Sequence, residues 1–333
     1  MSDHFSAIRV EISRTSPESE HLVDCSVFNS SGPLVAFGDP KRPTIARSAL
    51  KPIQVVPLVS SGAAEAFAFS DEDIALASSS HSAEPAQLDR VAAMLQRIGL
   101  DESALECGAS RPFGQDQADN LLRTGEPFRR IHNCCSGKHA GFLAISQHLG
   151  LDLMGYIEPG HRVQQLVTES IETFSGVDLD GQPIGVDGCG IPTHSLPLDR
   201  LAMSMVRLVS AGEGDEIDDL WASSADRVVE ALVPNAAWMA GAGRAEVHFA
   251  ELATEPLISK IGAEGVFMAA LPERGIGVAL KARDGARRAA DLAMEAVLAH
   301  LDVLTPDPTQ GGLAHHVTNA EGSVVGAMDV SWS

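Results

Sequence analysis

The chain has 333 residues, 44% hydrophobic and 21% charged, a composition typical of a globular protein with a sizeable core. Its formal net charge of -21 argues against nucleic acid or an anionic membrane as a partner, because both require a basic surface. No targeting segment is visible and no run reaches the roughly 18 to 20 apolar residues of a membrane span, so we expect a cytoplasmic protein.

Period-two alternation of apolar and polar side chains at residues 6–12, together with other strand-like runs bounded by turn residues, predicts strands at both ends of the chain. These runs lie at residues 6–12, 21–28, 34–37, 266–271, 275–281 and 322–330. Helical spacing dominates from about 43 to 250 and recurs at 287–301. We therefore expect an α/β (α+β) fold, in which strands from about 1–40 and 255–333 form an antiparallel sheet beside a large helical lobe, within a single domain of residues 1–333.

Three local patterns make further predictions. Ser70, followed three residues later by Asp73, predicts a helix N-cap with acidic residues in the first turn. Residues 108–130 are rich in Gly, Pro and Arg, which predicts an irregular surface loop. The acidic residues between 213 and 219 predict a solvated turn.

Ser48 and Lys51 form the first candidate catalytic pair. Residues i and i+3 share a helix face, so the two side chains can touch. A serine hydroxyl becomes a good nucleophile when a base takes its proton, and a lysine can be that base if burial or a nearby cation disfavours its charge. Pro52 and Pro57 predict that Ser48 lies near a helix start and that a kink falls near Pro57. Since this spacing also occurs by chance in most chains of this size, the pair needs support from other segments.

Ser80 and Lys260 supply that support. Ser80 lies in a Ser-His-Ser run, and Lys260 begins Lys-Ile-Gly just ahead of a predicted strand. The layout is similar to that of the penicillin-recognising serine acyl-transferases, whose motifs run S-x-x-K, S-x-N and K-T-G. Both later motifs depart from that pattern here. An acyl-enzyme mechanism is still expected, whereas a β-lactam substrate does not follow.

Cysteines form a second chemical signal, and in a reducing compartment they should be thiols or metal ligands. Lys138 and His139 follow Cys135 at i+3 and i+4, and Cys189 lies between two glycines of a predicted tight loop. Two thiolates and a nitrogen suit zinc. From chemistry alone His139 is the preferred nitrogen, because a lysine must first lose its proton. The alternative for any of these cysteines is a small buried hydrophobic residue, which we expect for Cys25 and Cys134.

Four segments together, residues 47–52, 133–141, 187–192 and 260–265, closely resemble the Rhizobium-type (class 3) L-asparaginases, the asparaginase II family. They occur in the family's order and span most of the chain. The resemblance implies a homodimeric amidohydrolase with a fold like those of serine β-lactamases and glutaminases. Its implied small-molecule substrate is L-asparagine, which such enzymes convert to L-aspartate and ammonia.

The resemblance also implies roles for individual residues. The nucleophile maps to Ser48 with Lys51, and a second pair maps to Ser80 and Lys260. The metal site, usually zinc, maps to Cys135, Lys138 and Cys189, so the implied nitrogen ligand is Lys138 and not His139. Arg47 is implied to hold the substrate α-carboxylate, with Asp187 and His139 beside the metal and substrate.

Two other functions remain open at this point. One is a β-lactamase or transpeptidase-like acyl hydrolase, which the altered second motif disfavours. The other is a non-catalytic zinc-binding substrate sensor, which would bind ligand without releasing ammonia. Asparagine and glutamine differ by one methylene, which a pocket discriminates by only ~1–3 kcal/mol, so the sequence does not choose between them.

Overall fold

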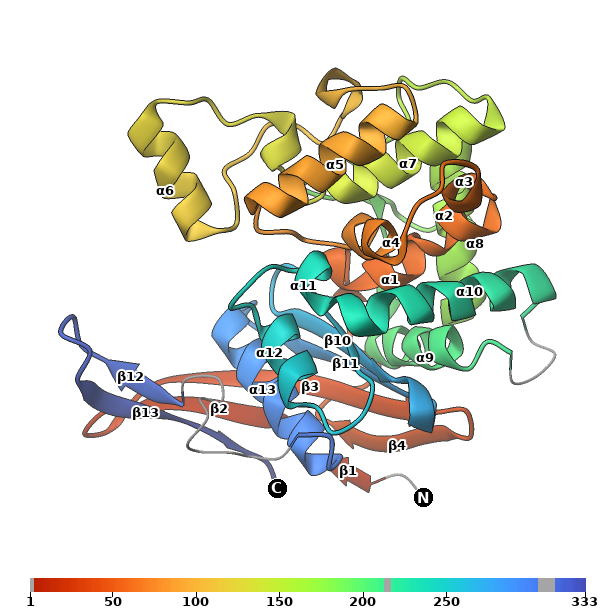
Figure 1. The fold of residues 1–333 in the computed structure, drawn as a ribbon. Helices are drawn as coiled ribbons and strands as arrows, with labels where there is room; N and C mark the ends of the chain where they lie inside the picture. Colours follow the sequence, from red (N-terminus) through yellow and green to blue (C-terminus); the bar gives the residue numbers. More distant parts are fainter. Residues whose placement is uncertain (1–2, 213–216, 305–314) are drawn as a thin grey trace. The chain divides into compact units, whose positions relative to one another are not determined.

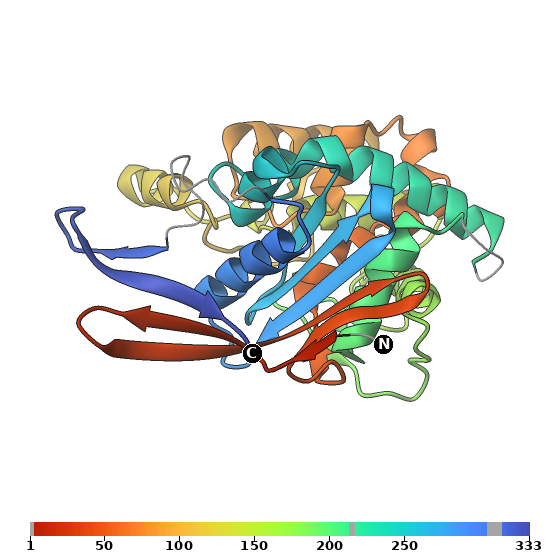
Figure 2. The ribbon, with the colours of Figure 1, turned by 90° about the horizontal axis from the view of Figure 1, so that it is seen from below.

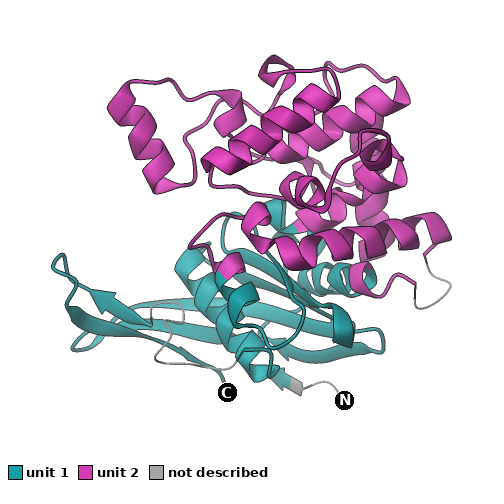
Figure 3. Cartoon of the chain, in the orientation of Figure 1, with its two compact units in different colours: residues 1–49, 195–207, 248–333 teal, residues 50–194, 208–247 magenta. Residues whose placement is uncertain are grey.

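The computed structural model describes residues 3–212, 217–304 and 315–333. The chain forms two compact units (Figure 3): unit 1 comprises residues 1–49, 195–207 and 248–333, and unit 2 comprises residues 50–194 and 208–247. Within the described ranges, no helix is long and apolar enough to cross a membrane. The acidic turn predicted at 213–219 lies mostly outside the described residues.

Unit 1 is built on a sheet of nine strands among the described residues (Figures 1 and 2). The strands are β1 (Asp3–Phe5), β2 (Ile8–Ser13), β3 (Pro17–Asn29), β4 (Gly32–Phe37), β9 (Ile258–Ile261), β10 (Val266–Leu271), β11 (Ile276–Ala282), β12 (His316–Thr318) and β13 (Val324–Ser331). Their main order is β12-β13-β2-β3-β11-β10-β9, all antiparallel, while β4 pairs with β3 and β1 adds to β4 in parallel. Strands from both chain ends therefore share one sheet, joined where β3 pairs with β11 and where β13 pairs with β2.

Two helices cover parts of this sheet. Helix α13 (Arg287–His300) lies against one face (Figure 2), and Ala289, Ala290, Ala293, Met294 and Val297 are buried there. The first turns of α9 (Leu198–Val209) pack on β11 at Gly277, where an added Cβ would lie 2.2 Å from the Ala202 carbonyl oxygen. A short pair of strands, β5 (Pro43–Ile45) and β8 (Ser195–Pro197), leads into the region of Ser48.

Unit 2 is mainly helical. Its helices are α1 (Lys51–Gln54), α2 (Val56–Ser60), α3 (Ala63–Ala66), α4 (Asp71–Ala77), α5 (Pro85–Arg97), α6 (Gln115–Thr124), α7 (Ser136–Leu149), α8 (Arg162–Ser175), α10 (Asp219–Leu232) and α11 (Ala236–Met239), and α12 (Ala245–Leu252) continues into unit 1. Short β6 (Gly185–Val186) and β7 (Pro192–Thr193) form a hairpin. With the sheet of unit 1, this helical lobe confirms the predicted α+β fold.

Helix α7 is the central helix of unit 2, and every residue from Ser136 to Ser146 is buried. It can approach α4 closely because Gly137 has no side chain: a Cβ there would lie 2.3 Å from the Leu76 carbonyl oxygen. Helix α4 begins as predicted, with Ser70 and Asp73 forming a reciprocal capping box. The first turn of α7 is thus held against a well-anchored neighbour.

The prediction of an irregular loop across residues 108–130 is partly wrong, because α6 forms within it. Gly114 precedes the helix and Gly125, with φ of 73°, ends it. The inner face of α6 buries Ala118 and Leu121. The turn-forming residues that suggested a loop therefore mark the two ends of a short helix, as glycine often does at a helix C-terminus.

Candidate active site

Ser48 lies in a strained turn. Residues Arg47–Leu50 form a 3-10 helix, η1, and Ser48 is half-buried in it. Arg47 has a φ of 52°, a left-handed conformation that costs a non-glycine residue roughly 1–2 kcal/mol. Helix α1 follows at once and ends at Val55, and α2 begins at Val56 with Pro57 in its first turn, which matches the kink predicted from the prolines. The strain falls on the residue directly before the predicted nucleophile.

The Lys260 segment lies beside this turn within unit 1. A Cβ added at Gly262 would lie 2.4 Å from the Ala46 carbonyl oxygen and 3.2 Å from the Ala49 backbone nitrogen. The end of β9 therefore touches the backbone on either side of Ser48. Lys260 is fully buried, and its Nζ donates to the carbonyl of Ile261 at 3.0 Å. The structure thus brings the first and third predicted motifs together.

Lys51 lies in a second cluster of candidate catalytic side chains, in unit 2. Its side chain is fully buried, and Nζ lies 2.9 Å from the Ser80 Oγ and 3.1 Å from the Cys135 Sγ, while donating to the Ser79 carbonyl. A buried amine in contact with a serine hydroxyl is the arrangement that proton transfer between them requires. The resemblance paired Ser80 with Lys260; the structure shows Ser80 hydrogen-bonded to Lys51.

The Ser80 segment is held in place by His81, which the sequence analysis did not single out. The Ala83 backbone N–H donates to His81 Nδ1 at 3.0 Å, so the ring proton is on Nε2, which donates to Ser136 Oγ at 2.8 Å. Burial, together with the charge of Lys51, lowers the pKa of His81 to about 3. The only hint in the sequence is a polar Ser-His-Ser run that the fold buries completely.

Cys135, Lys138 and Cys189 also come together in unit 2. All three are nearly fully buried, and the Lys138 Nζ donates to the Cys189 Sγ at 3.3 Å. Hydrogen bonds from Cys134 and Cys189, with the charges of the nearby lysines, hold the pKa of Cys135 well below its usual range despite burial. Burial disfavours the charge on Lys138, but the two sulfurs outweigh it and raise the pKa of Lys138.

This donor set fits zinc, since it combines two thiols, one already inclined to ionise, with a nitrogen. Cys135 precedes α7 and Lys138 lies in its first turn, while Cys189 comes from the β6–β7 loop. In the part of the chain that the structure describes, no group of three or more His, Cys, Asp or Glu side chains could hold a metal. The predicted metal site therefore needs the Lys138 amine as its third protein ligand.

The predicted substrate-binding residues occupy different positions. Arg47 belongs to unit 1, whereas Asp187 and His139 belong to unit 2. Asp187 shapes the Cys189 loop: its carbonyl accepts from the Gly190 N–H at 2.9 Å, and Gly190 has a φ of 93°. His139 is fully buried beside Lys138, and burial with the charge of that lysine lowers the pKa of His139 to about 3.

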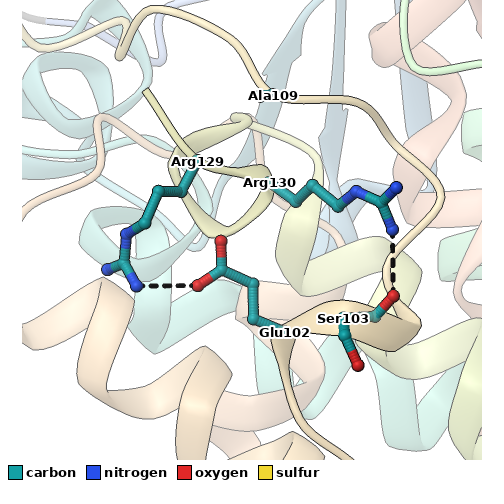
Figure 4. Close-up of a pocket in the computed structure, with 5 residues that line it drawn as sticks. All are labelled: Glu102, Ser103, Ala109, Arg129 and Arg130. Atoms are coloured by element: carbon teal, nitrogen blue, oxygen red, sulfur yellow. Dashed lines mark hydrogen bonds and ion pairs between the residues drawn. The ribbon is translucent and has the colours of Figure 1, made fainter. Parts of the chain in front are cut away.

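A surface pocket of about 650 Å³ opens elsewhere in unit 2 (Figure 4). Its lining residues are Glu102, Ser103, Ala109, Arg129 and Arg130. Arg129 pairs with Glu102 at 2.9 Å, and Arg130 donates to the carbonyl of Ser103, also at 2.9 Å. None of the predicted site residues lines this pocket. Its two guanidinium groups already bind protein groups, Arg129 the Glu102 carboxylate and Arg130 the Ser103 carbonyl.

The family model of L-asparaginase II matches residues 10–330. No curated protein matches the chain. Similar solved structures include Mglu in its native form, at 14% identity and a TM-score of 0.40, covering 87% of this chain and 66% of Mglu. This chain therefore spans slightly less than two thirds of the length of Mglu.

Two further solved structures are similar to the same extent. A probable glutaminase from Bacillus subtilis complexed with 6-diazo-5-oxo-L-norleucine has 12% identity and a TM-score of 0.40, covering 85% of each chain. A beta-lactamase from Mycobacterium bovis has 14% identity and a TM-score of 0.40, covering 84% of this chain and 94% of that one. At this level of similarity, the reaction must be argued from the family and from the side chains.

Proposed function

The chain belongs to the L-asparaginase II family, and we propose that it hydrolyses L-asparagine to L-aspartate and ammonia. Family membership supports an amidohydrolase. The observation that carries the proposal is the Lys51 amine, which is fully buried, lies 2.9 Å from the Ser80 hydroxyl and follows Ser48 by three residues. An acyl-enzyme reaction needs a hydroxyl nucleophile and a base that takes its proton, and a second hydroxyl can relay that proton.

In the proposed mechanism, Ser48 Oγ attacks the side-chain amide carbon while Lys51 accepts the hydroxyl proton. Backbone N–H groups stabilise the oxyanion of the tetrahedral intermediate. The C–N bond then breaks, and the amide nitrogen leaves as ammonia with the proton taken by Lys51. Ser80, hydrogen-bonded to the Lys51 Nζ, is placed to pass that proton on. Water then attacks the aspartyl ester, with Lys51 as base, and releases aspartate and Ser48.

Other residues support this reaction in the proposal. Lys260 is the second lysine of the site, on the strand whose end touches the Ser48 turn. Arg47 binds the substrate α-carboxylate, a pairing that suits a planar guanidinium. Asp187 and His139 complete the binding site.

Cys135, Lys138 and Cys189 would hold a zinc ion. When bound, zinc supplies positive charge that keeps both sulfurs as thiolates. The residues that would hold the metal lie next to Lys51 and Ser80, because Cys135 Sγ is 3.1 Å from the Lys51 Nζ. The protein is also proposed to be cytoplasmic and homodimeric, as the family resemblance implies. Light scattering on the purified chain tests the dimer.

Ammonia release from L-asparagine tests the function. The wild-type chain should release ammonia and aspartate, and Ser48→Ala should abolish turnover while the fold and metal content are kept. Glutamine in parallel measures the preference between the two amides, and nitrocefin tests the β-lactamase alternative. Binding of asparagine without ammonia release would favour a substrate sensor, and near-normal turnover by Ser48→Ala would refute the nucleophile.

A further inference from the structure

Tyr156 is the only tyrosine in the sequence, and its side chain is fully buried in unit 2. Its hydroxyl oxygen lies 2.8 Å from the Glu106 backbone nitrogen and 2.8 Å from His139 Nδ1. The Tyr156 ring packs edge-on against the His139 ring, with 5.5 Å between centroids. The Gln164 side chain binds the Tyr156 carbonyl at 2.8 Å, so the tyrosine is held at both its backbone and its hydroxyl.

These contacts decide which nitrogen of His139 carries the proton. A backbone N–H can only donate, so the Tyr156 oxygen accepts from Glu106. The tyrosine proton is then directed to His139 Nδ1, the other atom within hydrogen-bond distance. If Nδ1 carried the proton instead, the buried tyrosine proton would have no acceptor, which is unfavourable. The neutral imidazole therefore holds its proton on Nε2.

The Nε2 end of the ring is in an unusual state. His139 is fully buried, and among the residues that the structure describes its Nε2 has no hydrogen-bond partner. A buried donor without an acceptor is costly and uncommon, so such a group calls for a ligand or an ordered water. His139 directly follows Lys138 and lies one helical turn beyond Cys135 on α7, beside the proposed catalytic cluster.

We propose that Tyr156 is a positioning residue that fixes His139 as an Nε2–H donor, and that this donor binds an oxygen atom of the amino-acid amide substrate. This inference rests on the proposed function and gives His139 a defined chemical role. A protonated Nε2 has no lone pair for a metal. The same geometry therefore favours Lys138 over His139 as the nitrogen ligand of a zinc ion.

The tautomer can be measured without turnover. Nitrogen NMR of the full-length chain labelled with ¹⁵N-histidine separates protonated from unprotonated ring nitrogens, and His139→Asn identifies the His139 signals. In the wild type we expect Nε2 to be protonated and Nδ1 to be unprotonated. Tyr156→Phe should turn this into a mixture of tautomers. An unprotonated or metal-bound Nε2 in the wild type would overturn the proposal.

Substrate kinetics test the donor itself. The side-chain nitrogen of Gln can take the place of the His139 Nε2–H donor. The shorter Asn side chain reaches only the position of Nδ1, which faces Tyr156. The KM for asparagine of His139→Asn should exceed that of His139→Gln by roughly 3- to 10-fold, the value of one hydrogen bond. Tyr156→Phe should raise KM with a smaller change in kcat.

Ser224→Ala is the matched control for Tyr156→Phe, because it removes another buried hydroxyl, which donates to the Leu220 carbonyl at 2.6 Å in α10. It should lower thermal stability and leave KM unchanged. Equal KM values for the two His139 variants would overturn the donor role. A wild-type chain that releases no ammonia would refute the proposed function instead, and the NMR result would still decide the tautomer.

Discussion

Gly262→Ala should impair catalysis by displacing the turn that carries Ser48. Gly262 lies just beyond β9, where a new Cβ would be 2.4 Å from the Ala46 carbonyl oxygen. Contacts below 3.0 Å are essentially never seen for real Cβ atoms, so the two segments must separate by at least about 0.6 Å. The neighbour is backbone and not a flexible side chain, so it cannot rotate away.

The expected losses of stability and of kcat both follow from this displacement. Overpacking a tight contact typically costs ~1–3 kcal/mol of unfolding free energy. A misplacement near 1 Å costs a catalytic group about 100-fold in rate, so we expect kcat to fall about 10- to 100-fold. The backbone conformation of Gly262 is not left-handed, so strain from a positive φ adds nothing to this prediction.

Ammonia release and urea unfolding, measured on the same preparations, give the two quantities. The control is Gly160→Ala, where an added Cβ meets nothing within 4 Å and φ is again not positive. This control should keep wild-type kcat, and its free energy of unfolding should differ from that of the wild type by only a few tenths of a kcal/mol. The reasoning is refuted if Gly262→Ala is as active as Gly160→Ala.

Three further changes have defined outcomes. Burial raises the pKa of Asp24, but hydrogen bonds from Arg283 and other groups outweigh it and lower that pKa, so this stabilisation is present above about pH 4 and is lost as pH falls through the lower, folded value. Asp24→Asn should cost ~1–3 kcal/mol of unfolding free energy near neutral pH, because the Arg42 and Arg283 side chains are about a third exposed and stay hydrated. The variant should also lose less stability than the wild type as the pH is lowered. His81 has a folded pKa of about 3, below its unfolded value of about 6.5, so stability should fall by up to ~1.4 kcal/mol per pH unit as pH drops below about 6.5. His139, whose pKa is also lowered to about 3, contributes a similar slope, so His81→Asn should reduce the slope and not abolish it. A slope unchanged by His81→Asn would contradict the assignment. Cys189→Ser should lower the zinc content measured by mass spectrometry, whereas Cys25→Ser, a buried cysteine of unit 1, should not; equal loss in both would argue against the ligand set.

Several features could be predicted because they depend on neighbours along the chain. Alternating side chains predicted the strand that β2 forms, and strand-like apolar runs predicted β10 and β11. The Ser70–Asp73 spacing predicted a helix N-cap, which is present as a capping box. Pro57 predicted the break after α1. Helix α6 was missed because its short apolar face, at Ala118 and Leu121, is weaker than the turn residues around it.

The sequence by itself determined the antiparallel sheet from both chain ends and the reactive groups, because strand period, capping and motif spacing are properties of short segments. Only the tertiary structure decided which groups meet. It pairs Lys51 with Ser80 and sets the proton of His139 through Tyr156, and it brings together Cys135 and Cys189, which the family resemblance had grouped in advance. The physical reason is that these contacts join segments far apart in the chain, and no local pattern records which buried donor faces which acceptor.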